Sequence, residues 1–358
     1  MREALLWRAA DSDEPAVESA DATPGGGAFY GISAPAGIVQ CLLCRQFCRL
    51  APGEWGLCGV RVNQDGKLYT LVDDHVAALN LDPVEKKPLY HFLPGSMTYS
   101  LGTPGCNMHC RFCQNHDLAH SVKIDRVLRG RPISPLAIVN GAKASGAASI
   151  SYTYSEPTIF FELMLPTAHL AVAEGLKNIM VSNGYESRQC LKALAEVIHG
   201  VNFDLKAFSD GFYQRLCGAR LAPVLDTLRE AVKLGWWVEI TTLLIPGEND
   251  SPEELHKLAE FIAQDLGRHV PWHISRYHPA YQLKNPPTPP ETLEMAAQIG
   301  KAAGLDYVYV GNVHNPQWSD TRCPSCGAAA IVRRGYQVEI FAPDLICPSC
   351  GVKLPGVV

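Results

Sequence analysis

The stretch TYSLGTPGCNMHCRFCQN, residues 98–115, joins a short apolar run to a loop that carries three cysteines. They are Cys106, Cys110 and Cys113, in the spacing C-x3-C-x2-C. Thiolates are the ligands that iron–sulfur clusters require, and three of them leave the fourth iron of a cubane without a protein ligand. Such an open position is typical of a catalytic metal. The loop therefore predicts a [4Fe–4S] site, with a zinc ion that borrows His109 or His116 as the alternative.

After residue 98, apolar runs of strand length alternate with longer segments of helical period. The runs lie at 98–102, 148–154, 178–182, 201–205, 238–244, 272–277 and 307–311, and the helical segments at 134–146, 159–175, 187–200, 223–235, 251–267 and 291–304. Several segments open with Ser or Pro and close on Gly, as capped helices do. This alternation predicts parallel strands with right-handed crossovers, hence an α/β barrel or a doubly wound sheet. In a barrel, the chemistry would lie at the carboxyl ends of the strands.

Composition narrows the class of protein. The chain has 358 residues and a formal net charge of −5, without a basic stripe, so a nucleic-acid surface is not expected. The first residues turn acidic after three apolar ones, which excludes a signal peptide, and no run approaches the roughly 20 apolar residues of a bilayer span. A cytoplasmic protein is expected. Of the 13 cysteines, Cys190 and Cys217 stand alone and are expected to be buried thiols.

An N-terminal group of four cysteines lies in CLLCRQFCRLAPGEWGLCGVR, residues 41–61. Its members are Cys41, Cys44, Cys48 and Cys58. Four thiolates suit zinc or a fully ligated iron–sulfur cluster. Because the ferredoxin spacing is absent, zinc is favoured, and an electron-relay cluster is the alternative.

A C-terminal group forms two C-x2-C pairs, Cys323 with Cys326 and Cys347 with Cys350. An alternating stretch at 331–341 lies between them and is typical of a hairpin strand. The pattern predicts a zinc ribbon with a structural role. A docking role that uses Arg333 and Arg334 is the alternative.

The spacing C-x3-C-x-aromatic-C, with Phe112 as the aromatic residue, resembles the motif of the radical S-adenosylmethionine (SAM) superfamily. The resemblance implies a partial (β/α)6 TIM-like barrel of the radical SAM type, flanked by the N-terminal four-cysteine module and the C-terminal zinc ribbon. It also implies that the open iron binds the amino and carboxylate groups of SAM. Reductive cleavage would then yield methionine and a 5′-deoxyadenosyl radical, which takes hydrogen from an unidentified substrate. Phe112 would pack near the adenine.

Further strand ends match the family in order. YTYSEPTIF, residues 152–160, resembles its Gly-Gly-Glu-Pro turn, with Tyr154 and Ser155 in place of the glycines, and implies that Glu156 accepts a hydrogen bond from the SAM ammonium. The resemblance also implies that Ser155 and four polar residues at the next two strand ends bind the cofactor: Ser182, Asn183, Asp204 and Lys206. A simple Asp204–Lys206 salt bridge is the alternative. Candidate substrate-side groups, each more often structural, are Thr242, Asn249, His273 and His278.

Residues 37–358 as a whole resemble the radical SAM enzymes of the AmmeMemoRadiSam system. The matching segments include 41–48, 82–92, 104–115, 152–160, 181–185, 203–208, 241–250, 273–279, 307–313 and the terminal ribbon. The resemblance implies companion proteins of the AMMECR and Memo types and an electron donor such as flavodoxin or ferredoxin. The activating enzymes of glycyl-radical enzymes, such as pyruvate formate-lyase, are the second candidate, although they have an Arg where this chain has Thr241. A non-enzymatic zinc scaffold for protein or RNA binding is the third.

The expected domains are an N-terminal segment with a flexible linker at 1–36, a four-cysteine module at 37–95, the radical SAM barrel at 96–317 and the zinc ribbon at 318–358. The acidic, Gly-rich composition of 11–36 is too poor in large apolar residues to build a core, so ordered structure is expected to begin near Ile38. The segment DPVEKKPLYHF, residues 82–92, is expected to pack across the barrel mouth.

Overall fold

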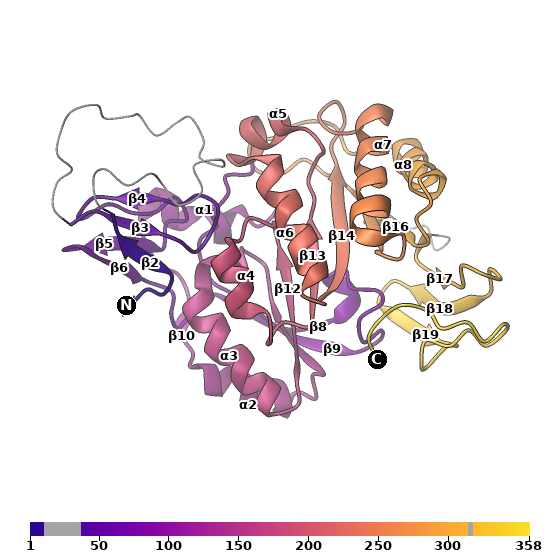
Figure 1. Ribbon diagram of the computed structural model, residues 1–358, viewed down its shortest axis with the longest axis horizontal. Coiled ribbons are helices and arrows are strands. Elements are labelled where there is room, and N and C mark those ends of the chain that lie inside the picture. Colours follow the sequence, from indigo (N-terminus) through magenta and orange to yellow (C-terminus); the bar gives the residue numbers. More distant parts are fainter. Residues whose placement is uncertain (11–36, 314–317) are drawn as a thin grey trace.

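The computed structural model describes residues 1–10, 37–313 and 318–358, so the expected linker at 11–36 lies outside the described residues. Seven parallel strands in sequence order form the central sheet, with one antiparallel strand at its edge (Figure 1). The parallel strands are β9 (Met97–Gly102), β11 (Ser149–Tyr152), β12 (Lys177–Ser182), β13 (Gly200–Asp204), β14 (Trp237–Leu244), β15 (Trp272–Arg276) and β16 (Val308–Gly311). The antiparallel strand is β8 (Ala78–Pro83). The expected α/β class with a parallel sheet is confirmed.

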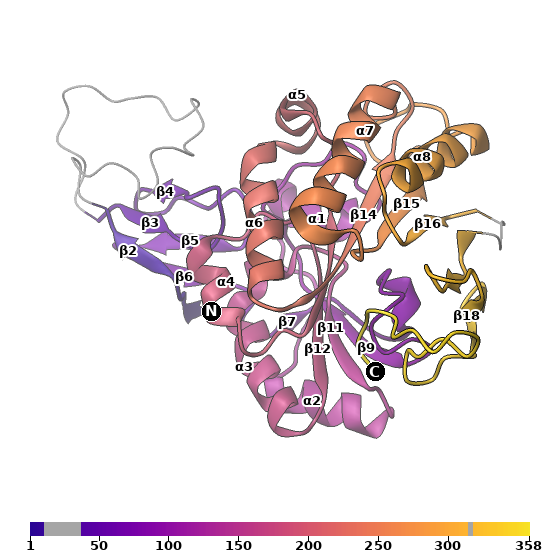
Figure 2. The ribbon, with the colours of Figure 1, turned by 45° about the vertical axis from the view of Figure 1, so that its right-hand side comes forward.

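Helices connect the parallel strands and lie along the sheet (Figure 2). They are α1 (His116–Asp125), α2 (Pro135–Ala144), α3 (Phe161–Ala173), α4 (Arg188–Leu194), α5 (Asp210–Phe212), α6 (Leu221–Lys233), α7 (Pro252–Phe261) and α8 (Pro290–Ala302). Each of the six expected helical segments contains a helix, and three begin with a serine whose Oγ accepts a backbone N–H of the first turn: Ser134, Ser187 and Ser251. None of the described helices is long and apolar enough to cross a membrane.

The core of the central sheet explains why its strands read as apolar runs. Val201, Ile240 and Ile274 have no exposed surface, because helices and loops cover both faces of the strands that carry them. The two cysteines outside the three groups, Cys190 and Cys217, are likewise fully buried, as expected. Polar side chains that line the candidate site lie at the carboxyl ends of these strands and in the loops that follow them.

Ordered structure begins earlier than Ile38, so that expectation is wrong. Strand β1 (Arg2–Glu3) pairs with β6 (Lys67–Thr70), which also pairs with β5 (Arg61–Gln64). Strand β2 (Trp7–Ala9) pairs with β3 (Val39–Cys41), which continues to β4 (Arg49–Leu50). The segment is too short to build a core, but it gains order by satisfying the backbone groups of strand edges that later residues provide.

The C-terminal residues form a separate small sheet on the opposite side of the central sheet from β1–β6 (Figure 1). Its strands are β17 (Thr321–Arg322), β18 (Ala329–Arg334) and β19 (Gln337–Ile340). The hairpin expected at 331–341 is therefore present as β18 and β19, with Arg334 opposite Gln337. A small core of its own lies beneath this sheet and includes Ile331, Ala342 and Leu345.

Candidate active site

The three cysteines predicted to hold the cluster lie in the loop between β9 and α1. The backbone N–H of His109, within this loop, donates to the carbonyl of Cys217 at 2.7 Å. Gly105 has a φ of +102°, and a Cβ there would lie 2.8 Å from the carbonyl oxygen of Cys58. Only glycine fits such a position without moving the backbone, so close packing against the N-terminal residues determines the path of the loop.

One cavity of ≈ 610 Å³ brings together the three predicted cluster cysteines and the seven residues predicted to bind SAM. Its lining includes Cys106, Cys110, Phe112, Cys113, Ser155, Glu156, Ser182, Asn183, Asp204 and Lys206. The loops after β9 and β11 and the ends of β12 and β13 provide these side chains. Because parallel strands end at the same edge of a sheet, residues that are far apart in the sequence converge there.

Lys206 supplies a partly buried positive charge in this cavity. Its Nζ lies 2.8 Å from Asp204 Oδ2 and 5.9 Å from the centre of the Phe112 ring. Burial alone would lower the pKa of Lys206, but Asp204 and the neighbouring Cys110 outweigh burial and raise it. The salt bridge that the sequence left as an alternative is thus present, and its cation lines the same cavity as the cysteines.

Thr158 and the end of β12 hold the Glu156 carboxylate in place. Its Oε1 accepts from the Thr158 hydroxyl at 2.6 Å and from Ser182 Oγ at 3.0 Å, and its Oε2 accepts from the Asn183 amide at 2.9 Å. Burial raises the pKa of Glu156. Tyr154 has a φ of +68°, so the backbone takes the left-handed conformation that glycine favours although a tyrosine is present.

Two further residues of the site were not predicted. Cys217 lies beside Cys110, and a hydrogen bond between the two thiols lowers the pKa of Cys110 to about 7, although burial acts to raise it. Lys123, on α1, donates to the carbonyl of Met108 at 2.7 Å, within the cysteine loop. No sequence motif surrounds either residue. The sequence predicts Cys217 only as a buried thiol, and the segment that forms α1 lacks a clear apolar periodicity.

Comparisons with known proteins agree with this geometry. The family model described as "Radical SAM superfamily" matches residues 100–262. The chain is 41% identical over 320 residues to "Uncharacterized protein MJ0808" of Methanocaldococcus jannaschii, across 88% of this chain and 95% of that protein. The chain is a member of the radical SAM superfamily.

Other radical SAM proteins are more distant. The pyruvate formate-lyase 1-activating enzyme of Escherichia coli is 24% identical over 181 residues, which cover 49% of this chain and 71% of that enzyme. A solved domain of a pyruvate-formate lyase-activating enzyme from Bacteroides vulgatus aligns with a TM-score of 0.41 and 18% identity, over 46% of this chain and 100% of that domain. By its match to the superfamily model and its similarity to the Escherichia coli enzyme, the chain is a radical SAM enzyme, and the superfamily implies a [4Fe–4S] cluster and SAM. The reading as a non-enzymatic scaffold is set aside.

A second, larger chamber of ≈ 1180 Å³ adjoins the cluster cavity of this radical SAM enzyme. Thr241, Ser275, Asn312 and Tyr336 line both spaces, which therefore form one continuous site. Residues of the C-terminal sheet, from Arg333 to Tyr336, form part of the chamber wall. The chamber is large enough to hold a substrate beside SAM.

The four candidate substrate-side groups separate into two kinds. His273 and His278 line the larger chamber. Thr242 and Asn249 line neither space. Their side chains form hydrogen bonds to backbone carbonyls instead: Thr242 Oγ1 donates to that of Leu205, and Asn249 Nδ2 donates to those of Lys206 and Leu243. A substrate-side role for Thr242 and Asn249 is therefore not supported, because their polar atoms already have partners.

The segment at 82–92 does reach the site. Lys87 Nζ donates to Asp82 Oδ2 at 2.6 Å and lies 4.8 Å from the centre of the Tyr154 ring, while the Tyr154 hydroxyl donates to the same carboxylate at 2.5 Å. Burial raises the pKa of Asp82, but these donors together with Lys86 lower it overall. Lys86 and Lys87 line the cluster cavity. The carboxylate thus joins this segment to the turn that carries Glu156.

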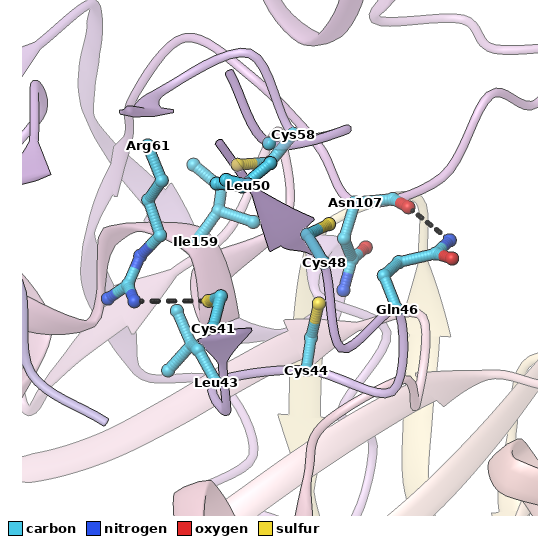
Figure 3. Close-up of a pocket in the computed structure, with 11 residues that line it drawn as sticks. Cys41, Leu43, Cys44, Gln46, Cys48, Leu50, Cys58, Arg61, Asn107 and Ile159 are labelled. Atoms are coloured by element: carbon cyan, nitrogen blue, oxygen red, sulfur yellow. Dashed lines mark hydrogen bonds between the residues drawn. The ribbon is translucent and has the colours of Figure 1, made fainter. Parts of the chain in front are cut away.

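The four N-terminal cysteines surround a small cavity of ≈ 20 Å³ beside the cluster loop (Figure 3). Cys41, Cys44, Cys48 and Cys58 all line it, together with Arg61 and Asn107. Burial is the largest cause that raises the pKa of Cys48 to about 12. A metal that binds these thiols must therefore displace their protons.

The four C-terminal cysteines are grouped more tightly. The sulfurs of Cys323 and Cys350 lie 3.6 Å apart, as do those of Cys326 and Cys347, and all four lie within 4.8 Å of one another. The group could hold a metal ion.

Proposed function

We propose that Cys106, Cys110 and Cys113 hold the [4Fe–4S] cluster of this radical SAM enzyme and that the adjoining residues hold SAM. The observation that supports this assignment is the shared cavity: the three thiols, the Lys206 ammonium and the Glu156 carboxylate line one space. Thiolates suit iron, and a cation and a carboxylate suit the carboxylate and ammonium of an amino acid. The donor set therefore fits both groups.

Each side chain has a separate task in this assignment. When bound, the cluster supplies the electron that splits SAM into methionine and a 5′-deoxyadenosyl radical. Lys206 pairs with the carboxylate of SAM, and Glu156 accepts a hydrogen bond from its ammonium through Oε2, which among the described residues accepts only from the Asn183 backbone N–H. Phe112 offers an apolar face to the adenine, Ser155 and Ser182 supply hydroxyls beside the methionine and ribose, and the larger chamber receives the substrate whose hydrogen is removed.

The test is anaerobic reconstitution with iron and sulfide, followed by SAM and a strong one-electron reductant. The wild-type chain is expected to release methionine and 5′-deoxyadenosine. Cys113→Ala is expected to abolish this release, because two thiolates do not hold a cubane. Cys190→Ala, at a buried cysteine that does not line the cavity, is the matched control and is expected to retain it. Release of 5′-deoxyadenosine by the Cys113 variant at the wild-type rate would contradict the assignment.

The finer family assignment is to the AmmeMemoRadiSam system, supported by the order of the matching segments along 37–358. In that assignment the companions are of the AMMECR and Memo types, the electron donor is a flavodoxin or ferredoxin, and the reducing cytoplasm is the compartment. The domains are 37–95, 96–317 as a partial (β/α)6 barrel, and 318–358 as a zinc ribbon. Zinc is supported by sulfur distances of 3.6 Å, because Zn–S bonds of about 2.3 Å in a tetrahedron separate sulfurs by about 3.8 Å.

Activation of a glycyl-radical enzyme is the second candidate, favoured by the similarity to the pyruvate formate-lyase 1-activating enzyme. Thr241 argues against it, because this uncharged side chain lines both the cluster cavity and the chamber where an Arg would be expected. Incubation with SAM, reductant and a glycyl-radical enzyme distinguishes the two candidates. A glycyl radical in the electron paramagnetic resonance (EPR) spectrum supports activase work, and 5′-deoxyadenosine without that signal supports another substrate.

A further inference from the structure

We propose that Cys41, Cys44, Cys48 and Cys58 hold a second iron–sulfur cluster, of the [4Fe–4S] type, and not a zinc ion. The sequence alone favoured zinc for this group. Two observations favour a cluster: the spacing of the sulfurs and two buried donors without acceptors. The site is separate from the SAM cavity and goes beyond the function proposed above.

Sulfur spacing separates the two four-cysteine groups. The C-terminal sulfurs all lie within 4.8 Å of one another, as a single zinc ion requires. Of the residues that the structure describes, no three in the N-terminal group approach one another this closely, although all four cysteines line one cavity. Sulfurs that bind different irons of a cluster lie farther apart than sulfurs that share one ion. The N-terminal arrangement therefore suits a polynuclear cluster better than zinc.

The cavity wall also carries buried donors that need an acceptor. Asn107 Nδ2 and Arg61 Nε are buried and have no hydrogen-bond partner within the described part of the chain. Figure 3 shows the side-chain nitrogen of Asn107 on the side of Cys44 and Cys48. Unpaired buried donors are rare because each costs free energy. The bridging sulfides and thiolates of an iron–sulfur cluster are acceptors for such donors.

A buried arginine lies beside the thiols. The Arg61 Nη1 donates to Cys41 Sγ at 3.4 Å, and the Arg61 side chain is 2% exposed. Because the buried Glu162 carboxylate already pairs with this guanidinium, Arg61 contributes a hydrogen bond to the site and no net charge. This hydrogen bond supports a metal site of either kind, and the sulfur spacing favours the cluster.

The two proposed clusters would be close neighbours. The Cys106 N–H donates to the carbonyl of Cys58 at 3.3 Å, so one ligand of each site is joined by a backbone hydrogen bond. Gln46 Nε2 donates to the carbonyl of Asn107 at 2.8 Å, which ties the N-terminal loop to the SAM-cluster loop a second time. Asn107 itself follows Cys106 in the sequence and lines the N-terminal cavity.

The experiment uses the full chain, purified anaerobically from iron-supplemented cells, and a triple variant in which Cys106, Cys110 and Cys113 are each changed to Ser. The triple variant is expected to retain about four irons and about four sulfides per chain. Its cluster is expected to be reducible, with an EPR signal that does not change when SAM is added. Addition of Cys44→Ser and Cys48→Ser to the triple variant is expected to remove this iron, whereas zinc bound by the C-terminal group remains.

Loss of all iron from a folded triple variant, with about two zinc ions per chain instead of one, would overturn the proposal. If the triple variant does not fold, Mössbauer spectra and metal counts of the wild-type chain decide. About eight irons per chain support the second cluster, and about four irons with two zinc ions contradict it. Failure of the SAM-site assignment is distinguishable, because it would leave wild-type spectra unchanged by SAM while the N-terminal iron persists.

Discussion

His91 is a single side chain whose protonation state follows from its two partners. Its Nδ1 lies 2.8 Å from the Pro355 carbonyl, which can only accept, and its Nε2 lies 2.7 Å from the Tyr309 hydroxyl. The neutral ring with a proton on Nδ1 satisfies both contacts. Burial lowers the pKa of His91 to about 4 from an ordinary value of 6.5.

This lowered pKa predicts a pH dependence of stability. Between pH 6.5 and 4 the unfolded chain binds a proton that the folded chain does not, so the free energy of unfolding falls as the pH falls. His91→Gln cannot take up the proton. The difference in free energy of unfolding between wild type and His91→Gln is expected to change by about 1 kcal/mol between pH 7.5 and 5.5, measured by denaturant titration. The control is His256→Gln, at an exposed histidine, whose free energy of unfolding should change with pH in the same way as that of wild type. The same pH dependence in His91→Gln and wild type would contradict the prediction.

Lys206 predicts how SAM binds. Charge-assisted hydrogen bonds contribute about 1.5–3 kcal/mol, so Lys206→Met is expected to raise the Kd for SAM roughly tenfold to a hundredfold. Equilibrium dialysis against the cluster-loaded protein measures this change. Lys143→Met is the matched control, because Lys143 pairs with Glu174 on the surface. An unchanged Kd for SAM in the Lys206→Met variant, with the cluster intact, would show that Lys206 pairs with Asp204 and does not bind SAM.

The residues that the sequence predicts for the SAM site line one cavity, because each lies at the end of a parallel strand or in the segment that follows it. The contacts that support them from other parts of the chain could not be predicted. Tyr154 takes a positive φ although its side chain does not favour it, and Asp82 binds both Lys87 in its own segment and Tyr154, which lies 72 residues away in the sequence. Such contacts depend on the three-dimensional path of the chain, which local sequence patterns do not encode.

Among the structural elements, the C-terminal sheet depends most on its cysteines. Its core has only seven buried residues, two of which are Cys323 and Cys347. A core this small seldom stabilises a domain without a metal or another constraint. The sheet nevertheless contacts the rest of the chain, since Arg333 Nη2 donates to the Tyr90 carbonyl at 2.6 Å and its guanidinium lies 4.1 Å from the Tyr90 ring centre.

Cys347→Ala is therefore expected to release the bound metal and to unfold β17–β19 locally while the central sheet persists. Hydrogen exchange should become fast at 318–358 and stay slow in β12 and β13. Elemental analysis should find one metal ion fewer per chain. The control is Cys190→Ala, a buried cysteine outside the metal groups, which should keep full metal content and protection. Slow exchange at 318–358 in metal-free Cys347→Ala protein would contradict a metal-dependent fold.

The elements themselves were largely predictable where periodicity is strong. The seven apolar runs correspond to the seven parallel strands, and the six periodic segments each contain a helix. Helix α1 was not predicted, since His116, His120 and Asp125 dilute its apolar face. Strands β1 and β2 were not predicted either, because two or three residues have no readable period and are ordered only by pairing with distant strands.

Across the whole molecule, two cysteine-rich parts of the chain flank one parallel sheet, and both contribute residues near the carboxyl ends of its strands. The N-terminal group meets the cluster loop through Cys58 and Cys106, and the C-terminal sheet contributes Tyr336 to both spaces of the site. Both flanking parts therefore border the site that we propose for the cluster, SAM and substrate.

A buried ion pair joins the N-terminal part to helix α3, which covers the central sheet. Arg61 and Glu162 pair with each other, and their side chains are 2% and 0% exposed. Both also bind the backbone of Leu5: the carboxylate accepts its N–H at 2.7 Å, and the guanidinium donates to its carbonyl at 3.0 Å. Because loss of one partner leaves the other charge buried, Glu162→Gln is expected to lower the free energy of unfolding by about 3–5 kcal/mol. Glu174→Gln breaks the exposed pair with Lys143, 47% and 48% exposed, and is expected to lower it by less than about 1 kcal/mol. Denaturant unfolding of both variants measures the contrast, and equal effects would mean that the buried pair does not join the two parts.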